Sequence, residues 1–563
     1  MIHIVTKEEI QKGWSGEKKY RITDENGTPY LLRVANSSQK TKKEAEFRLM
    51  QRVAALGIPM CEPLEFGEDE EGVWSIQRWI DGKDMEEVIP ALPDARQYAY
   101  GLEAGAYLKL IHSIPAPANQ EPWEPRFNRK MDYKIQKYTE CPLKYEGGEA
   151  FLSYIAENRH LLAGRPQTFQ HGDYHIGNMM LDRNRKLQII DFNRFDFGDP
   201  WEEFNRIVWC AQKSPLFATG MVNGYFHGEV PMEFWRLLAL YIASNTLSSL
   251  YWAIPFGEGE IETMRRQAAE VLTWYDGMKN PIPTWYRCNF HLQYLDGIPF
   301  KMKTPFDFSF LSEYGRVFKI FDDQDSGNIC FGCEKDGKRV FVKFAGAPTA
   351  EYDGDPADAV ERLLKTLPIY RDLRHKNLIA LLDSREVAGG YAMIFEWAEG
   401  ISMGRMYPPE HQSFMALPTA DRLQVFSDIL DFFLYVGFQN YLAVDFYDGS
   451  VMYDPKTRKT TICDIDFFRR LPTQNDMGRM WGSSKFQAPE EYVPGAALDT
   501  ATNVYNLGSM AFALFASYQR TRESWELSDR LFAVATKATA SDRRDRYPDV
   551  KALKEAWEAA LHE

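Results

Sequence analysis

One stretch of the chain, FQHGDYHIGNMMLDRNRKLQIIDF at residues 169–192, restricts the fold more than any other. Its segments MMLD and RKLQIID have the composition of two short strands joined by a polar turn, so we expect a hairpin. Because a hairpin returns the chain, Asp191 should come back beside Asn178, while Asp173 lies on the loop before the first strand. The sequence therefore predicts that a carboxylate, an amide and a second carboxylate converge at one point.

Oxygen-donating side chains on a hairpin suit Mg²⁺, which is usually held by one or two carboxylates together with substrate phosphates. The remaining carboxylate can then orient a hydroxyl group and accept its proton, which is what phosphoryl transfer requires. The alternative is structural, with a loop acid that caps a turn and Asp191 closing a strand. HGDxxxxN, followed thirteen residues later by IDF and then by GDP, favours the phosphotransfer interpretation.

HGDYHIGN, IIDF and GDPWEEF resemble the signature of the aminoglycoside phosphotransferase family, over roughly the first 280 residues. That family shares its fold with choline kinases and, more distantly, with protein kinases. The resemblance implies that Asp173 is the catalytic base and that Asn178 and Asp191 bind the metal. It also implies that His171 and Asp199 shape the loop. The implied cofactors are Mg²⁺ and ATP, with GTP as an open alternative.

Upstream of this motif, a small lobe of that kind needs a phosphate-gripping loop, a basic residue on a strand and an acid on a helix. KGWSGEKKYRI offers Gly13 and Gly16 between two expected strands, a pattern common to many turns. PYLLRVAN is typical of a strand, and its Arg33 stands where the family more often has Lys but keeps the charge that can grip phosphate. EAEFRLMQRV predicts an amphipathic helix on which Glu46 lies beside the buried face and pairs with Arg33; a solvated helix acid is the alternative.

The second half of the chain contains an altered copy of these features. VFVKFAG places Lys343 inside an apolar strand, where a nucleotide phosphate is the usual partner in kinases. In LAVDFYDGSVMYDPKTRKTTICDIDFF, Asp445 is followed five residues later by Ser450, and a polar hairpin leads to Asp464 and Asp466. This copy resembles the catalytic core of bacterial serine/threonine protein kinases. The resemblance implies that Asp445 is catalytic, that Ser450 and Asp466 bind metal, with Asp464 as an open alternative to Asp466, and that Lys343 binds the cofactor.

Other segments of the second half both follow and depart from the protein-kinase pattern. GSSKFQAPEEY and RRDRYPDV resemble the segments in which Glu490 and Arg546 would form an internal ion pair. Ser450 stands where kinases place a metal-binding Asn, and Phe468 replaces a glycine. Asn503 replaces an Asp that normally braces the catalytic loop.

These departures leave the activity of the second half open. The helix acid falls on Thr366 by register, with Glu361 offset, whereas Lys343, Asp445 and Asp466 are retained. One alternative is an active kinase with a protein as its substrate. The other is a pseudokinase that serves as a regulatory or partner-docking module.

At 563 residues the chain is too long for a single core, and the prolines of GMKNPIPTW at residues 277–285 indicate a break. We expect an α+β fold of two tandem bilobal protein-kinase-like folds, each with a small antiparallel β lobe and a larger helical lobe. The predicted domains are 1–282, with lobes at about 1–80 and about 81–280, and 283–563, with lobes at about 310–397 and about 400–563.

Composition narrows the partners and the location. The 66 basic and 80 acidic residues give a net charge of −14, which argues against nucleic acid or anionic lipid as the main partner. The start of the chain lacks a secretion-signal pattern, and FWRLLALYIASNTLSSLYWAI is interrupted by Arg236 and Asn245, so it predicts a buried helix and no membrane span. The seven cysteines include one CxxC, Cys330 and Cys333, which favours reduced thiols over zinc and a cytoplasmic location.

Together these features predict an ATP-dependent phosphotransferase that moves the γ-phosphate to a hydroxyl group of a small molecule. An aminoglycoside-like compound or another amino-alcohol or sugar is the expected acceptor. The same fold also phosphorylates choline, homoserine, thiosugars and macrolides, so the acceptor stays open.

Overall fold

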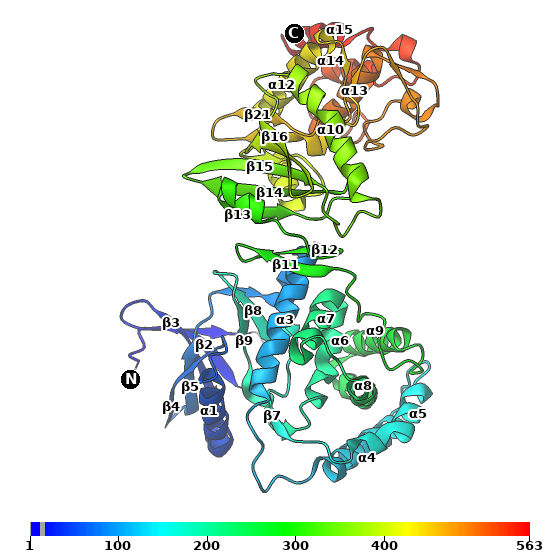
Figure 1. Cartoon of the computed structure of the whole chain (residues 1–563). Helices are drawn as coiled ribbons and strands as arrows, with labels where there is room; N and C mark the ends of the chain where they lie inside the picture. The colour runs from blue at the N-terminus through cyan, green and yellow to red at the C-terminus, as the bar shows by residue number, and fades with distance from the viewer. Residues whose placement is uncertain (1, 12–16, 563) are drawn as a thin grey trace. The chain divides into compact units, whose positions relative to one another are not determined.

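The computed structural model describes residues 2–11 and 17–562, and contacts divide the chain into two units, Met1–Leu292 and Gln293–Glu563 (Figure 1). This division lies ten residues beyond the predicted boundary at 282/283. The reason is that the segment after the last helix of the first unit packs back onto that unit. Trp285 is buried in its core, Thr284 donates a hydrogen bond of 2.9 Å to the Trp274 carbonyl, and the ring of Phe290 lies 5.7 Å from that of Tyr98.

The first unit begins with a five-stranded antiparallel sheet in the order β1-β2-β3-β5-β4. One long helix, α1 (Lys40–Ala54), follows the third strand. Its buried residues Glu46, Leu49, Met50 and Val53 recur at a spacing of three to four, as in a helix with one face against a core. The strands are β1 (Thr6–Ile10), β2 (Lys18–Thr23), β3 (Pro29–Ala35), β4 (Pro63–Asp69) and β5 (Gly72–Arg78).

The remainder of the first unit is mainly helical and carries short strands that hold the candidate site. The helices are α2 (Met85–Val88), α3 (Asp94–Ile111), α4 (Trp123–Glu140), α5 (Glu149–Asn158), α6 (Ile207–Lys213), α7 (Pro215–Phe226), α8 (Met232–Ala253) and α9 (Glu258–Trp274). The strands are β6 (Gly82–Asp84), β8 (Met179–Asp182) and β9 (Leu187–Ile189), which form one sheet, and β7 (Thr168–Gln170) and β10 (Asp196–Gly198), which form another.

Helix α8 is the central helix of this core. It packs against α4, α5 and α9, and most of its residues are buried. The stretch Met232–Phe256 is long and apolar enough to cross a membrane by length and composition alone, and 67% of its most apolar window is buried inside the fold. Burial of this kind is what the sequence analysis expects of a core helix.

The second unit repeats the arrangement of the first sheet. Its five antiparallel strands have the order β13-β14-β15-β17-β16, which matches β1-β2-β3-β5-β4 strand for strand, and a helix, α10 (Pro356–Asp372), again follows the third strand. The strands are β13 (Arg316–Phe321), β14 (Asn328–Lys335), β15 (Lys338–Ala345), β16 (Leu381–Val387) and β17 (Gly390–Glu396). A hairpin of β11 (His291–Leu295) and β12 (Ile298–Met302) precedes them.

Helices again dominate the part that follows. The helices are α11 (Pro408–Met415), α12 (Thr419–Phe438), α13 (Thr500–Ala516), α14 (Asp529–Ala538) and α15 (Val550–His562). The short strands are β18 (Ile401–Ser402), β19 (Tyr441–Leu442), β20 (Val451–Asp454), β21 (Lys459–Ile462), β22 (Arg469–Arg470), β23 (Thr473–Gln474) and β24 (Ala497–Leu498). The prediction of a mixed α+β fold with small antiparallel sheets is confirmed.

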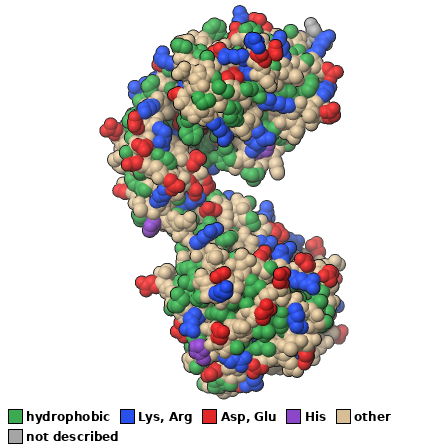
Figure 2. Space-filling model, turned by 90° about the vertical axis from the view of Figure 1, so that its right-hand side faces the viewer, with side chains coloured by type: hydrophobic (Ala, Val, Ile, Leu, Met, Phe, Trp, Pro, Cys, Tyr) green, Lys and Arg blue, Asp and Glu red, His purple; other side chains and the backbone are tan. Residues whose placement is uncertain are grey.

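Acidic and basic side chains are interspersed over the visible face of each unit, with apolar side chains between them (Figure 2). The net charge of the chain therefore does not describe the charge at any one place on this face. The charge of a site has to be taken from the residues that line it.

The predicted ion pair between Glu490 and Arg546 is confirmed. The guanidinium donates two hydrogen bonds, from Nη1 to Glu490 Oε1 at 2.7 Å and from Nη2 to Oε2 at 3.0 Å. The Arg546 side chain is completely buried and that of Glu490 is 9% exposed. A buried pair of this geometry is costly to break, because removing one partner leaves the other charge uncompensated.

We therefore expect Arg546→Met to destabilise the second unit by about 3–5 kcal/mol. Urea unfolding of the full chain, followed by the midpoint of each transition, measures the change. Arg544→Met is the matched control, since Arg544 is 86% exposed and its pair with Asp542 should contribute about 0–1 kcal/mol. Equal shifts for the two variants would show that the buried pair does not stabilise the unit.

Candidate phosphotransfer site

The predicted hairpin at residues 179–189 is present and ends beside Asp191. Met179 of β8 pairs with Ile189 of β9, and beyond this pair the Ile190 N–H donates a hydrogen bond of 3.1 Å to the Asn178 carbonyl. The next residue, Asp191, has φ = 67°, in the left-handed region. Such a conformation is uncommon for a residue with a side chain and turns the chain sharply away from the strand.

The loop before the hairpin is tied to the segment after it. His171 is fully buried, and its Nε2 donates to the Ile190 carbonyl at 2.9 Å. Gly172 has φ = 84°, and a Cβ atom there would lie 1.8 Å from the carbonyl oxygen of Arg194, so only glycine allows this close approach. Glu203 accepts hydrogen bonds from the backbone of Gly172 at 3.0 and 3.2 Å.

Asp199 stabilises the segment that follows the hairpin through side-chain hydrogen bonds. Its carboxylate accepts hydrogen bonds from Arg165 Nε at 2.7 Å and Nη2 at 3.0 Å, and from the Tyr241 hydroxyl at 2.6 Å. The Arg165 guanidinium stacks on Trp201, 3.8 Å from the ring centre. These contacts agree with the structural role that the sequence analysis gives to His171 and Asp199.

Asn178 is the residue through which the two acids are brought together. Its side-chain nitrogen donates a hydrogen bond of 2.9 Å to the backbone carbonyl of Asp173, and its own carbonyl accepts from the residue before Asp191. The side chains of Asp173 and Asp191 are 16% and 28% exposed, so both remain accessible to a ligand. The catalytic and metal-binding roles of these three residues remain predictions.

Arg33 is the basic strand residue that the sequence predicts, but its partners differ from the expected one. On β3, its Nη1 lies 2.9 Å from Asp191 Oδ1 and its Nε lies 2.7 Å from Glu17 Oε2. The predicted direct pair with Glu46 is wrong: Glu46 pairs with Lys43 at 2.6 Å, and Lys43 also pairs with Glu17. Arg33 and Glu46 are thus linked through two intervening side chains. Lys43, three residues before Glu46 on the same helix, occupies its carboxylate.

The ion pair with Arg33 lowers the pKa of Asp191. Burial disfavours the ionised form of Asp191, but the charge and hydrogen bond of Arg33 outweigh it and hold the pKa of Asp191 below its usual value. Arg33 Nη2 is buried without a hydrogen-bond partner in the described part of the chain. A phosphate oxygen would satisfy this donor, as the sequence analysis expects.

The donor set at the hairpin fits Mg²⁺. Within residues 2–11 and 17–562, no group of three or more His, Cys, Asp and Glu side chains could hold a metal on its own. Asp191 offers a carboxylate oxygen besides the one that faces Arg33, and Asn178 offers its amide oxygen because its nitrogen is already used. Two hard oxygen donors, completed by water and phosphate, are a usual Mg²⁺ environment.

Residues 7–237 match the model of the phosphotransferase enzyme family. The match supports a kinase-like transferase, and members of that family use ATP and a metal in general. No curated protein is similar enough to the chain to count as a relative. The matched residues include β3, α1 and the whole hairpin, so the region matched by the family model covers the geometry described above.

Two predicted residues of this region cannot be placed, and one basic residue was missed. Gly13 and Gly16 lie outside the described residues. Lys19, on β2, pairs in register with Arg33 on β3. Burial and the charge of Arg33 lower the pKa of Lys19, while Asp191 acts in the opposite direction. The alternation of KKYRI could have indicated that Lys19 lies beside Arg33 in the sheet.

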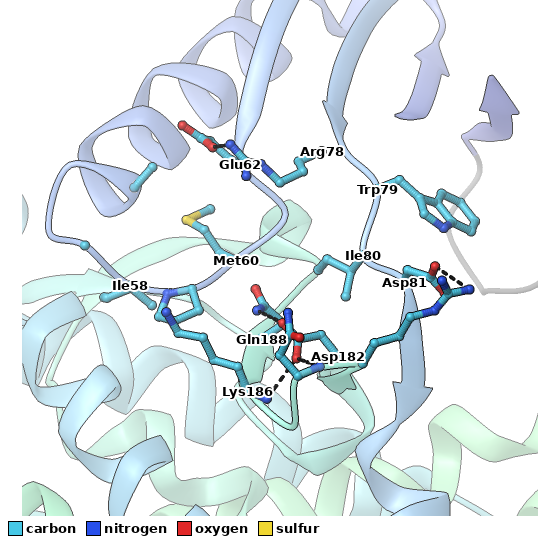
Figure 3. Close-up of a pocket in the computed structure, with 15 residues that line it drawn as sticks. Ile58, Met60, Glu62, Arg78, Trp79, Ile80, Asp81, Asp182, Lys186 and Gln188 are labelled. Carbon is cyan, nitrogen blue, oxygen red and sulfur yellow. Dashed lines mark hydrogen bonds and ion pairs between the residues drawn. The ribbon is translucent and has the colours of Figure 1, made fainter. Parts of the chain in front are cut away.

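A cavity of about 470 Å³ opens at the other end of the hairpin (Figure 3). Its walls are the loop after α1, the segment after β5 and the turn between β8 and β9. Figure 3 shows Ile58, Met60 and Ile80 facing the cavity, and Arg78 forms an ion pair with Glu62 at its edge. Asp173, Asn178 and Asp191 do not line this cavity, so it is not the place where Asn178 and Asp191 meet.

At its open end, the hairpin of the second unit has the same strand pairing and the same closing hydrogen bond as the hairpin of the first unit. Val451 pairs with Ile462, and the Cys463 N–H donates a hydrogen bond of 2.9 Å to the Ser450 carbonyl. The next residue, Asp464, has φ = 57°. It therefore occupies the position that Asp191 has in the first unit.

This register shows which acid of the second half corresponds to Asp191, while the predicted metal-binding role of Asp466, with Asp464 as the alternative, remains a prediction. Asp464, and not Asp466, corresponds to Asp191, because each stands two residues after the last residue of an equivalent strand pair, Met179–Ile189 in the first unit and Val451–Ile462 in the second. Asp466 then stands two residues beyond Asp464 in the chain, and Phe468, which the sequence comparison places at a glycine position of kinases, follows two residues later. Phe468 is buried in the core and takes no part in the site.

Asp466 is held by two side chains of the small lobe. Lys343 Nζ lies 2.5 Å from Asp466 Oδ2 and 3.2 Å from Asp464 Oδ1. The hydroxyl of Tyr370, on α10, donates to Asp466 Oδ1 at 2.9 Å and accepts from the Ile465 N–H at 3.2 Å. Both carboxylate oxygens of Asp466 are therefore occupied by protein groups.

The other predicted residues of the second site lie on the same loop and hairpin. Burial, followed by the charges of Asp464 and Asp466, raises the pKa of Asp445 to about 7. Ser450 is fully buried, and its hydroxyl has no partner in the described part of the chain. Asn503 braces the loop through both ends of its amide, which bond the backbone N–H and carbonyl of Ala443 at 3.0 and 2.7 Å.

Glu491, two per cent exposed, links the segment after this loop to α13, and burial raises its pKa to about 7. A folded-state pKa above the unfolded value of about 4.3 means that the folded protein binds the extra proton. We expect Glu491 to make the free energy of unfolding fall as pH rises from about 4.5 to about 7, and Glu491→Gln to remove this contribution while that of Asp445 remains.

The variant should therefore gain about 2–3 kcal/mol relative to the parent across that pH range, measured by chemical unfolding at pH 5, 6 and 7. Glu555→Gln, at a 66% exposed position, is the control and should follow the parent. Parallel pH profiles for parent and Glu491→Gln would show that Glu491 is ionised in the folded state.

Proposed function

We propose that residues 1–292 form an ATP-dependent phosphotransferase that moves the γ-phosphate to a hydroxyl group of a small molecule. The observation that carries this proposal is the tie from the Asp173 loop through Asn178 to Asp191, with the unpartnered Arg33 nitrogen beside it. The family match over residues 7–237 supports the same reaction class. Composition favours a cytoplasmic enzyme, and GTP stays an alternative nucleotide.

In the proposed reaction, Asp173 accepts the proton of the acceptor hydroxyl. The hydroxyl oxygen forms a bond to the γ-phosphorus as the bond from that phosphorus to the bridging oxygen of the nucleoside diphosphate breaks. Arg33 would donate a hydrogen bond to a phosphate oxygen, and Asn178 and Asp191 would hold Mg²⁺. When bound, the metal neutralises charge on the phosphate oxygens.

Replacing Asp173 by Asn should lower turnover by about 10²–10⁴-fold, the usual contribution of a positioned base, with little effect on nucleotide binding. ADP release against a panel of hydroxyl acceptors measures turnover, and calorimetry measures nucleotide binding. Asp132→Asn, at an exposed position of α4 that pairs with Arg159, is the control. Full turnover in Asp173→Asn would remove the residue from the role of base.

We further propose that the second unit is a kinase-like nucleotide-binding domain. Its sheet order, its hairpin and Lys343 support this proposal, and phosphorylation of a protein is its expected reaction. The alternative is a regulatory or partner-docking pseudokinase. The contacts of Asp466 favour that alternative, because Lys343 and Tyr370 together occupy both oxygens of its carboxylate.

Activity of the second unit can be separated from that of the first in the full chain. In an Asp173→Asn background, incubation with labelled ATP and Mg²⁺ or Mn²⁺ should label the chain or a generic protein substrate if the second unit is active. Addition of Asp445→Asn should then abolish the label. Label that is absent from the first variant, or unchanged in the second, would favour the regulatory alternative.

A further inference from the structure

Positively charged side chains gather on one side of Asp173. Arg206 Nε lies 3.4 Å from Asp173 Oδ1, and Arg194 Nη1 lies 3.6 Å from Oδ2. Lys134, on α4, is close enough to Arg206 for the two charges to repel, and Lys130 lies one turn earlier on that helix. The cations therefore extend from the proposed base toward α4.

The ammonium group of Lys134 is half-buried and has no ion pair or hydrogen bond within the described ranges. Burial, together with the charges of Lys130 and Arg206, lowers the pKa of Lys134 to about 7, while Glu202 acts in the opposite direction. Withdrawing a cation from water without an anion costs free energy. A bound anion would compensate this cost.

The acids of this neighbourhood do not supply that anion. Glu202 Oε1 faces Lys130 at 3.5 Å, and its Oε2 accepts a hydrogen bond of 3.2 Å from Gln170. Arg206 has Asp173 as its ion-pair partner in the described part of the chain, and Asp173 is the group that must remain available to the acceptor hydroxyl.

His175 adds no positive charge near neutral pH. It lies 3.6 Å from Asp173, and burial lowers its pKa to about 4. The charged side chains of Arg194, Arg206 and Lys130, together with the partly protonated Lys134, thus face two carboxylates, those of Asp173 and Glu202. The local balance is positive although the whole chain has a net charge of −14.

From this arrangement we infer that the acceptor of the first unit is an anion: a small hydroxyl compound that also carries a carboxylate or phosphate group, bound by Arg206 and Lys134. This inference rests on the proposed phosphotransferase function. The hydroxyl group would lie at Asp173 and the anionic group toward α4. An amine-rich acceptor such as an aminoglycoside would meet like charges there, which disfavours it.

The test compares acceptors of one size that differ in charge, using the full chain with ATP and Mg²⁺. Glycerol, D-glycerate, glycerol 3-phosphate and 2-amino-1,3-propanediol form one series, and glucose, gluconate, glucose 6-phosphate and glucosamine form a larger one. We expect kcat/KM for an anionic member to exceed that for its neutral counterpart by about tenfold or more. The carboxylate and phosphate members tell which anion is preferred.

Calorimetric binding of the same compounds in the presence of ADP gives the corresponding ratio if transfer is too slow to measure. Equal use of charged and neutral members, preference for the neutral or cationic ones, or no binding of any anion would overturn the inference.

Variants of the two cations separate acceptor binding from nucleotide binding. Arg206→Gln and Lys134→Met should each raise KM or Kd for the preferred anion about tenfold and leave the KM for ATP within about twofold. Arg206→Lys, which keeps the charge, should restore part of the lost affinity. Lys137→Met is the control on α4, since Lys137 is exposed and pairs with Glu140 at 3.4 Å. A raised KM for ATP instead would assign the cations to the nucleotide and overturn the inference.

The proposed phosphotransferase function and the inference about its acceptor are contradicted by different experimental results. A chain that neither binds nor hydrolyses ATP contradicts the phosphotransferase function itself. A chain that phosphorylates neutral or cationic acceptors with no advantage for anions contradicts only the inference about the acceptor.

Discussion

The hydrogen bond from the Ile190 N–H to the Asn178 carbonyl is the contact on which the candidate site depends. It extends the hairpin one step beyond the last strand pair, so that Asn178 and Asp191 face each other across the open end. The left-handed conformation of Asp191 then turns the carboxylate out of the strand and toward Arg33. Without this tie, the acid would continue along the strand, and no arrangement of the helical part could return it to Asn178.

The second unit shows which part of this arrangement a sequence motif can predict. The hairpin and its flanking acids follow from local patterns, whereas the buried pair of Glu490 and Arg546 could be expected only from the resemblance of two distant segments to protein kinases. The identity of the acid that corresponds to Asp191 does not follow, since the letters IDF direct attention to Asp466. Counting from the strand pairs instead leads to Asp464, because it follows Ile462 by two residues, as Asp191 follows Ile189.

The ion pairs of the small lobe could be predicted from the sequence only in part. A basic residue on β3 could be expected from the strand pattern, but that pattern does not show which carboxylate lies beside the basic residue. Lys43 is three residues from Glu46 on one helix, a spacing at which side chains meet, so the local pair forms and Glu17 takes the place beside Arg33. Glu17 comes from the segment before β2, and nothing in the periodicity of that segment places it against β3.

The charge that an acceptor meets beside Asp173 differs from the net charge of the whole chain. The net charge of −14 is compatible with cationic or neutral substrates and selects none of them, and the Debye length at physiological ionic strength is about 8 Å. Beyond that distance the acids elsewhere on the chain are screened, whereas Arg206 and Lys134 act on an acceptor at contact distance and partly out of water. An acceptor whose hydroxyl reaches Asp173 therefore responds to these two cations more strongly than to the sum of charges on the chain, and the local balance decides which acceptor the site can hold.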